Sequence, residues 1–129
     1  FSVPGGTLST NRTLRLTLVG FGQLISGNLT ARLKYGTTTL ISHVHSTAQN
    51  ASSYYVGDFR LLGKGATNAQ RGYMATQWGI TAVTLEVATN SGSATENSAG
   101  ALTLSVTFQF SVAATNNTFV LEHAVLELL

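Results

Sequence analysis

Apolar and small polar residues alternate without a break in LTLSVTFQF, residues 102–110. Successive side chains of an extended chain point to opposite faces, so this order places Leu, Val and Phe on one face and Thr, Ser and Gln on the other. A helix would spread the same residues around its axis, because its period is about 3.6 residues. The stretch therefore predicts a β-strand with one buried face and one face that meets water through uncharged groups.

The same alternation recurs along the chain, and residues that favour turns, mainly Gly, Asn and Ser, separate its runs. The expected strands are residues 13–20, 29–35, 37–45, 54–62, 70–78, 80–88, 101–110 and 118–128. This spacing, without a convincing helical period, predicts an all-β fold of about eight antiparallel strands in two packed sheets. The strand number and the absence of the immunoglobulin Cys and Trp arrangement favour a jelly-roll sandwich over an immunoglobulin-like one.

Two connections between these strands have a recognisable character. The sequence Tyr35-Gly36-Thr37-Thr38 predicts a tight hairpin turn, because glycine adopts backbone angles that are closed to other residues. Residues 88–100 are small and polar and are expected to form the longest loop, either a mobile tip or a contact arm.

Charged residues are scarce, since seven Lys and Arg and five Asp and Glu give a formal net charge of +2 over 129 residues. So few bases cannot form the dense patch that neutralises nucleic-acid phosphates, and no nucleic-acid partner is expected. No run approaches the roughly 20 consecutive apolar residues of a membrane helix, so no membrane partner is expected. The chain has no Cys, which excludes a disulfide framework and a thiolate metal site.

The length fits a single domain, residues 1–129, with one core. Phe1-Ser2-Val3 has the character of the middle of a strand, so some residues upstream of Phe1 are expected to be missing. Stability in such a chain has to come from packing, hydrogen bonds or association with other subunits.

His43-Val44-His45 is the sharpest local motif, because residues two apart on a strand share a face and both imidazoles could bind one metal ion. A third ligand is required, and His123 is the remaining histidine. The motif is similar to the first motif of cupins, but Gln49 stands where cupins have glutamate, and their second motif is missing. We therefore expect no metal and no other cofactor, with His43 and His45 as surface or interface residues.

Acid–base catalysis would need convergent carboxylates, and the chain has only five, at Asp58, Glu86, Glu96, Glu122 and Glu127. Glu86 could pair with another carboxylate as in jelly-roll glycosidases, or could be a solvated charge that protects a strand. No catalytic residue is assigned, and the chain is expected not to be an enzyme.

Aromatic residues offer a different kind of site. Tyr54, Tyr55, Tyr73 and Trp78 could build a platform for a sugar. The alternative is packing in the core or at a subunit interface, where aromatic side chains contribute strongly.

Four stretches carry a further pattern, and they are residues 8–16 (LSTNRTLRL), 33–40 (LKYGTTTL), 65–70 (GATNAQ) and 121–129 (LEHAVLELL). Together they resemble small jelly-roll domains at the C-termini of structural proteins from tailed bacteriophages. The resemblance implies a trimeric protein on the virion surface, similar to capsid decoration proteins and to fibre or spike domains. It carries no catalytic role to any residue.

Composition and resemblance together predict a non-enzymatic virion surface protein, either a capsid decoration (cement) protein or a fibre-head domain. Its partners would be two further copies of itself and other virion proteins, such as the major capsid protein. One alternative is a carbohydrate-binding jelly-roll module that recognises a host-surface glycan. Another is a metal-dependent jelly-roll enzyme built on His43 and His45.

Overall fold

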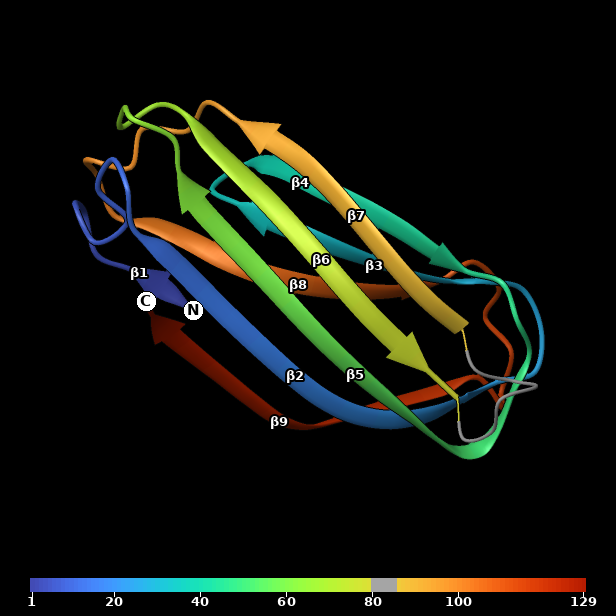
Figure 1. The fold of residues 1–129 in the computed structure, drawn as a ribbon. Helices are drawn as coiled ribbons and strands as arrows, with labels where there is room; N and C mark the ends of the chain where they lie inside the picture. Colours follow the sequence, from blue (N-terminus) through green and yellow to red (C-terminus); the bar gives the residue numbers. More distant parts are fainter. Residues whose placement is uncertain (80–85) are drawn as a thin grey trace.

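The structure is a computed structural model that describes residues 1–79 and 86–129, with the backbone alone for residues 50–52. Two β-sheets face each other in it, and the first and last residues lie near one another at one end (Figure 1). The described residues contain no helix, and so none that could cross a membrane. The chain is therefore an all-β sandwich, as its alternating pattern predicts.

Nine strands occur in the described residues. They are β1 (Ser2–Val3), β2 (Thr13–Leu24), β3 (Leu29–Tyr35), β4 (Thr38–His45), β5 (Gln49–Gly63), β6 (Gln70–Trp78), β7 (Glu86–Ala94), β8 (Leu102–Phe110) and β9 (Thr118–Leu128). One sheet has the strand order β1-β8-β3-β4 and the other has the order β7-β6-β5-β2-β9. Every pair of neighbours in both sheets is antiparallel.

Most of the predicted strands are confirmed, and residues 29–35, 70–78 and 118–128 match β3, β6 and β9 from end to end. The strand predicted at 80–88 begins outside the described residues, and only its last three residues lie in β7. The short strand β1 makes the total nine rather than about eight, because Ser2 and Val3 pair with Thr103 and Leu102.

The loop predicted at residues 88–100 was wrong over its first half, since β7 continues to Ala94 and pairs with β6 along its whole length. Small polar residues usually mark a loop, but here the ladder to β6 satisfies their backbone groups. The inward positions Ala88, Gly92 and Ala94 hold small residues because β7 lies against β4. Packing against a second sheet therefore overrides the local preference.

The predicted hairpin at Tyr35–Thr38 is confirmed, because β3 ends at Tyr35, β4 begins at Thr38 and Gly36 has a φ of 58°. Glu96, in the connection between β7 and β8, reinforces this turn. Its Oε1 atom accepts hydrogen bonds from the backbone N–H and the hydroxyl of both Thr37 and Thr38, at 2.7–3.0 Å.

Two clusters of side chains fill the space between the sheets. The larger one contains inward-facing leucines of β2 and residues of both sheets, among them Leu14, Leu16, Tyr35, Phe59 and Met74. The smaller one is aromatic and contains Leu24, Leu29, Tyr55 and Trp78, with Phe108, Phe110 and Phe119 packed against it. The alternating apolar residues are thus the core that their period predicts.

The two sheets meet closely along one edge, where β7 passes the backbone of β4. A Cβ atom on Gly92 would overlap the carbonyl oxygen of Leu40 in β4. Only glycine lets the strands approach so closely, because the obstacle is backbone and cannot rotate away. We call this the closed edge of the sandwich.

Replacement of Gly92 tests how far the fold depends on the closed edge. We expect Gly92→Ala to lower the free energy of unfolding by about 3 kcal/mol or more, because overpacking against backbone forces a strand to move. Denaturant unfolding followed by circular dichroism measures the change. Gly100→Ala is the matched control, since a Cβ there meets nothing nearer than 3.8 Å, and an equal loss in both variants would contradict the argument.

Candidate functional site

His43 and His45 lie on the inward face of β4, near the end of that strand. His45 is fully buried, so the expectation of a surface or interface residue is wrong for it, whereas the side chain of His43 keeps 20% of its surface exposed. Their rings meet edge to face with the centroids 4.5 Å apart. The strand geometry predicted from the sequence is confirmed, because the two imidazoles share a face.

Glu86, the first residue of β7, brings a carboxylate to these imidazoles from the other sheet. Its Oε1 atom lies 3.4 Å from His43 Nε2 and 3.4 Å from His45 Nδ1. Its Oε2 atom accepts a hydrogen bond of 3.3 Å from the backbone N–H of Thr47. We call His43, His45 and Glu86 the His–Glu cluster, and it bridges the two sheets at the closed edge.

The surroundings keep His45 uncharged at neutral pH. Burial lowers the pKa of His45 to about 4, and the Glu86 carboxylate opposes that shift without cancelling it. The rings of Tyr55 and Trp78 lie 5.7 Å from the ring of His45 on its apolar side. Neither ring nitrogen of His45 makes a well-aligned hydrogen bond with a described residue, although Nδ1 faces Glu86.

The remaining histidine, and the residue at the position of the cupin glutamate, lie elsewhere. His123 is exposed on β9, which forms the opposite edge of the five-stranded sheet from β7. Gln49, at the position where cupins have glutamate, is buried at the start of β5. Sequence reasoning missed the role of Glu86, because a separation of 41 residues from His45 carries no spacing signal and only the inter-sheet packing brings them together.

The cluster does not have the composition of a glycosidase site. Glu86 faces two imidazoles, and among the described residues no second carboxylate joins it. Two imidazoles and one carboxylate are instead a donor set that suits a divalent transition metal.

The four aromatic residues named as a sugar platform separate into two pairs. Tyr55 and Trp78 are fully buried in the aromatic core cluster and present no surface to a ligand. Tyr54 and Tyr73 are exposed on the outer face of the five-stranded sheet, with exposures of 58% and 40%. They lie on neighbouring strands but at opposite ends of them, since Tyr73 pairs with Arg60 and Tyr54 lies next to the Trp78 end.

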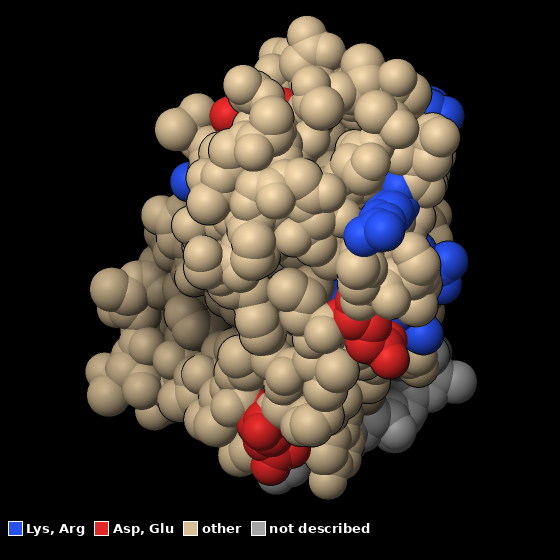
Figure 2. Space-filling model, turned by 90° about the vertical axis from the view of Figure 1, so that its left-hand side faces the viewer, with Lys and Arg blue, Asp and Glu red and all other residues tan. Residues whose placement is uncertain are grey.

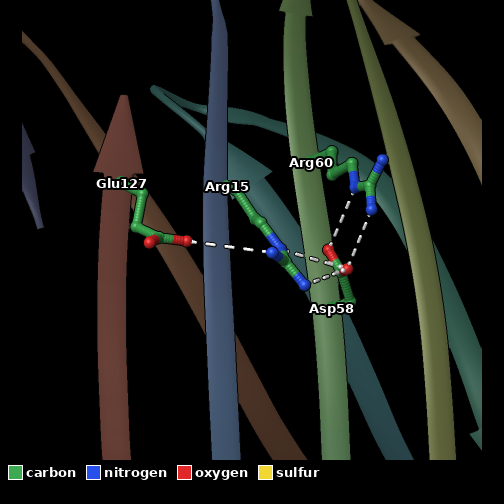
Figure 3. A network of polar contacts seen from close by, with 4 residues as sticks. All are labelled: Arg15, Asp58, Arg60 and Glu127. Atoms are coloured by element: carbon green, nitrogen blue, oxygen red, sulfur yellow. Dashed lines mark hydrogen bonds and ion pairs between the residues drawn. The ribbon is translucent and has the colours of Figure 1, made fainter. Parts of the chain in front are cut away.

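A polar network crosses the outer face of the same sheet (Figure 3). The carboxylate of Asp58 on β5 contacts Arg15 on β2 at 3.0 Å and Arg60 on its own strand at 3.1 Å. Arg15 also approaches Glu127 on β9 at 4.0 Å. Desolvation acts to raise the pKa of Asp58, but the hydrogen bonds and charges of Arg60 and Arg15 outweigh it, and the pKa lies below its ordinary value.

A depression of about 580 Å³ lies beside this network on the outer face. Asp58, Arg60 and Tyr73 line it, together with residues of β7 and the C-terminal Leu129. The guanidinium carbon of Arg71 lies 5.5 Å from the centroid of the Tyr73 ring, so the Arg71 side chain covers one face of that ring.

The side of the sandwich opposite the closed edge is incompletely covered. The five-stranded sheet ends there in β9, and the four-stranded sheet ends in the two-residue strand β1 beside β8. Leu121 of β9 lines the gap yet remains 50% exposed, and Leu128 remains 48% exposed. We call this the open edge.

A groove of about 180 Å³ runs along the open edge. Its lining side chains are all uncharged, and they belong to Phe1, Leu16, Leu18, Leu104, Ser105, Val106, Phe108, Leu121 and Ala124. Figure 2 looks onto the end of the molecule that holds the two termini, and shows a hollow bordered by residues other than Lys, Arg, Asp and Glu. The sequence predicted that β9 alternates but not that Leu121 and Leu128 on its inward face would be left incompletely covered.

Comparisons of the chain with protein-family models, with curated proteins and with solved structures find no significant match.

The polar network predicts how stability depends on pH. Because the pKa of Asp58 is lower in the folded protein than the ordinary 3.8, its contribution is present above pH 3.8 and is lost as the pH falls through the folded value. We expect Asp58→Asn to lower the free energy of unfolding by about 1 kcal/mol at pH 7, with the difference from the parent protein shrinking below pH 3.8.

Denaturant unfolding at several pH values measures this difference. Glu122→Gln is the control, since Glu122 forms no ion pair with any described residue. A loss in Asp58→Asn that stays constant down to pH 2 would show that the network does not act through the ionised carboxylate.

Proposed function

We propose that this chain is a non-enzymatic structural domain of a bacteriophage virion surface, either a capsid decoration protein or a fibre head. It acts by docking subunit against subunit, first with two further copies of itself and then with other virion proteins. The observation that carries the proposal is the open edge, where Leu121 and Leu128 on the inward face of β9 remain about half exposed.

The groove at the open edge suits a second copy of the same chain. A contiguous exposed apolar surface marks an interaction site in soluble proteins. Leu121 on the inward face of β9 lines this groove and is 50% exposed, and Leu128 on the same face is 48% exposed. Each copy therefore offers both an apolar strand and an apolar groove, and the net charge of +2 creates little repulsion between copies.

The free edge of β9 adds backbone groups to this surface. Among the described strands, β9 pairs with β2 alone, so its other edge is unpaired. A contact between the β9 edge of one copy and the groove of the next is heterologous, and three such contacts close into a ring when the rotation is 120°. This supports the trimer that the phage resemblance implies.

The order of strand pairing supports a jelly-roll origin. The long strand β2 pairs with the last strand β9, and β3 pairs with β8, so strands from the end of the chain lie beside strands from its beginning. In a jelly roll the next strands to pair would be β4 and β7. Here they are in contact across the closed edge, although each belongs to a different sheet.

The outer surface suits attachment better than turnover. Thr, Ser and Asn side chains on the outer faces can hydrogen-bond to neighbouring subunits without the cost of burying charge. A trimer on a virion would also bind at several places at once, so weak individual contacts become strong through effective concentration.

One observation favours the carbohydrate-binding alternative, namely the depression that Tyr73, Asp58 and Arg60 line on the outer face. An aromatic ring beside paired charges is a common arrangement for stacking and orienting a sugar. Asp58 is already saturated by two arginines and Tyr73 is partly covered by Arg71, so this role ranks second.

The oligomeric state tests the main proposal. We expect analytical ultracentrifugation to give about three times the chain mass of 13.6 kDa at micromolar concentration. Leu121→Glu should weaken association by about a hundredfold or more, because it places an unpaired charge in the apolar interface.

Val87→Glu is the matched control, since Val87 is 65% exposed on the outer face of β7. A protein that stays monomeric at high concentration, or a Leu121→Glu variant that still forms trimers, would overturn the proposed interface. If the trimer is found, the position of the domain in images of intact particles distinguishes a capsid decoration protein from a fibre head.

Glycan-array binding tests the alternative role. If the depression binds sugar, we expect Tyr73→Ala to weaken binding by about tenfold or more and Tyr54→Ala to leave it unchanged, because only Tyr73 lines the depression. Equal binding by the parent protein and both variants would remove the carbohydrate hypothesis for this surface.

A further inference from the structure

We infer that the His–Glu cluster is a binding site for one divalent transition-metal ion, Zn²⁺ being the best fit, and that the ion joins the two sheets at the closed edge. This goes beyond the proposed function, which does not depend on a metal. It rests on the placement of His43, His45 and Glu86 between the sheets.

The first argument is geometric. The three ligand atoms of the cluster all lie within 4.8 Å of one another, and Glu86 Oε1 is 3.4 Å from one nitrogen of each imidazole. Tetrahedral Zn²⁺ at about 2.0–2.1 Å from nitrogen and oxygen ligands holds those ligands about 3.3 Å apart. Both carboxylate–imidazole separations therefore already match, and a small ring rotation brings the imidazoles into range of one ion.

The second argument is the unpaired state of His45. Its side chain is fully buried, and neither ring nitrogen has a well-aligned hydrogen-bond partner among the described residues. Leaving a buried polar group unsatisfied costs about 1–3 kcal/mol. A metal ion bonded to one nitrogen removes the cost for that nitrogen, and a neutral imidazole with a free lone pair is the form that binds metal.

The third argument is the support behind the carboxylate. The backbone N–H of Thr47 holds Glu86 Oε2, which leaves Oε1 directed at the two imidazoles. Hydrogen bonds of this kind orient the ligands in protein metal sites and tune their affinity. The exposure that remains on His43 and Glu86, 20% and 17% of their side chains, provides a route for the ion to enter.

The donor set also selects the metal. Two imidazole nitrogens and one carboxylate oxygen suit Zn²⁺, Co²⁺ or Ni²⁺, whereas Ca²⁺ and Mg²⁺ prefer sites made of oxygen atoms. Since β4 and β7 belong to different sheets and share no backbone ladder, the ion would reinforce the contact that Glu86 already makes with the two imidazoles. Its role is that of a structural clamp, with a fourth position left for water.

Titration of the chelator-treated protein with ZnCl₂ and with CoCl₂ tests the site. We expect one ion bound per chain, a visible Co²⁺ absorption typical of tetrahedral coordination, and no binding of Mg²⁺ or Ca²⁺ at the same concentrations. At a Zn²⁺ concentration about a hundredfold above Kd, the Tm should rise by about 10 °C.

His43→Ala and Glu86→Gln are the informative variants, because both side chains are partly exposed and their loss leaves the buried core in place. Each should lower Zn²⁺ affinity by about a hundredfold and abolish the Tm shift, while the circular dichroism spectrum stays that of the parent. His123→Ala, which removes an exposed histidine on β9, should bind as the parent does.

The inference is overturned if the parent protein binds no stoichiometric Zn²⁺ and shows no Co²⁺ spectrum. It is also overturned if His43→Ala and Glu86→Gln bind as tightly as the parent, or if His123→Ala alone loses binding. If one cluster variant fails to fold, the other decides the question, because the Co²⁺ spectrum of the parent reports tetrahedral coordination and its loss in a folded variant reports which residue supplies a ligand.

Discussion

The unequal width of the two sheets governs the whole molecule. Five strands pack on four, one of which is only two residues long, and the sheets are aligned at the β4 and β7 edge rather than centred. That alignment requires close backbone approach between Gly92 and Leu40. The difference in width between the two sheets therefore falls entirely at the opposite edge. The last strand, β9, therefore extends past its cover, and its inward leucines lie half in the core and half in water.

The two sites of interest lie at the two edges that this alignment creates. At the closed edge, close approach of the sheets brings Glu86 from β7 against His43 and His45 from β4. At the open edge, the absence of a facing strand leaves an apolar groove. One constraint thus concentrates the polar donors on one side and the unsatisfied apolar surface on the other, which separates a site for an ion from a site for a subunit.

Charge is used sparingly in this architecture and mostly on the outside. Asp58 links β5 to β2 through Arg15 and pairs with Arg60 on its own strand, and Glu96 holds the β3–β4 hairpin through Thr37 and Thr38. Glu86 is the carboxylate that the fold turns inward, where it meets imidazoles rather than water. A buried charge is tolerated only with partners, so the inward position of Glu86 is informative about what it does.

The sequence by itself determined the class of the fold and most of its strands, because the two-residue period of Leu102–Phe110 and similar runs is a local property that extended backbone converts directly into a buried face. It also determined that His43 and His45 share a face. Only the tertiary structure decided that β7 continues through a loop-like sequence to Ala94, that Trp78 and Tyr55 are buried, that Glu86 completes the His–Glu cluster, and that β9 is left uncovered. Each of these depends on which strand lies opposite which across the sandwich, and that choice is made by long-range packing that no local spacing records.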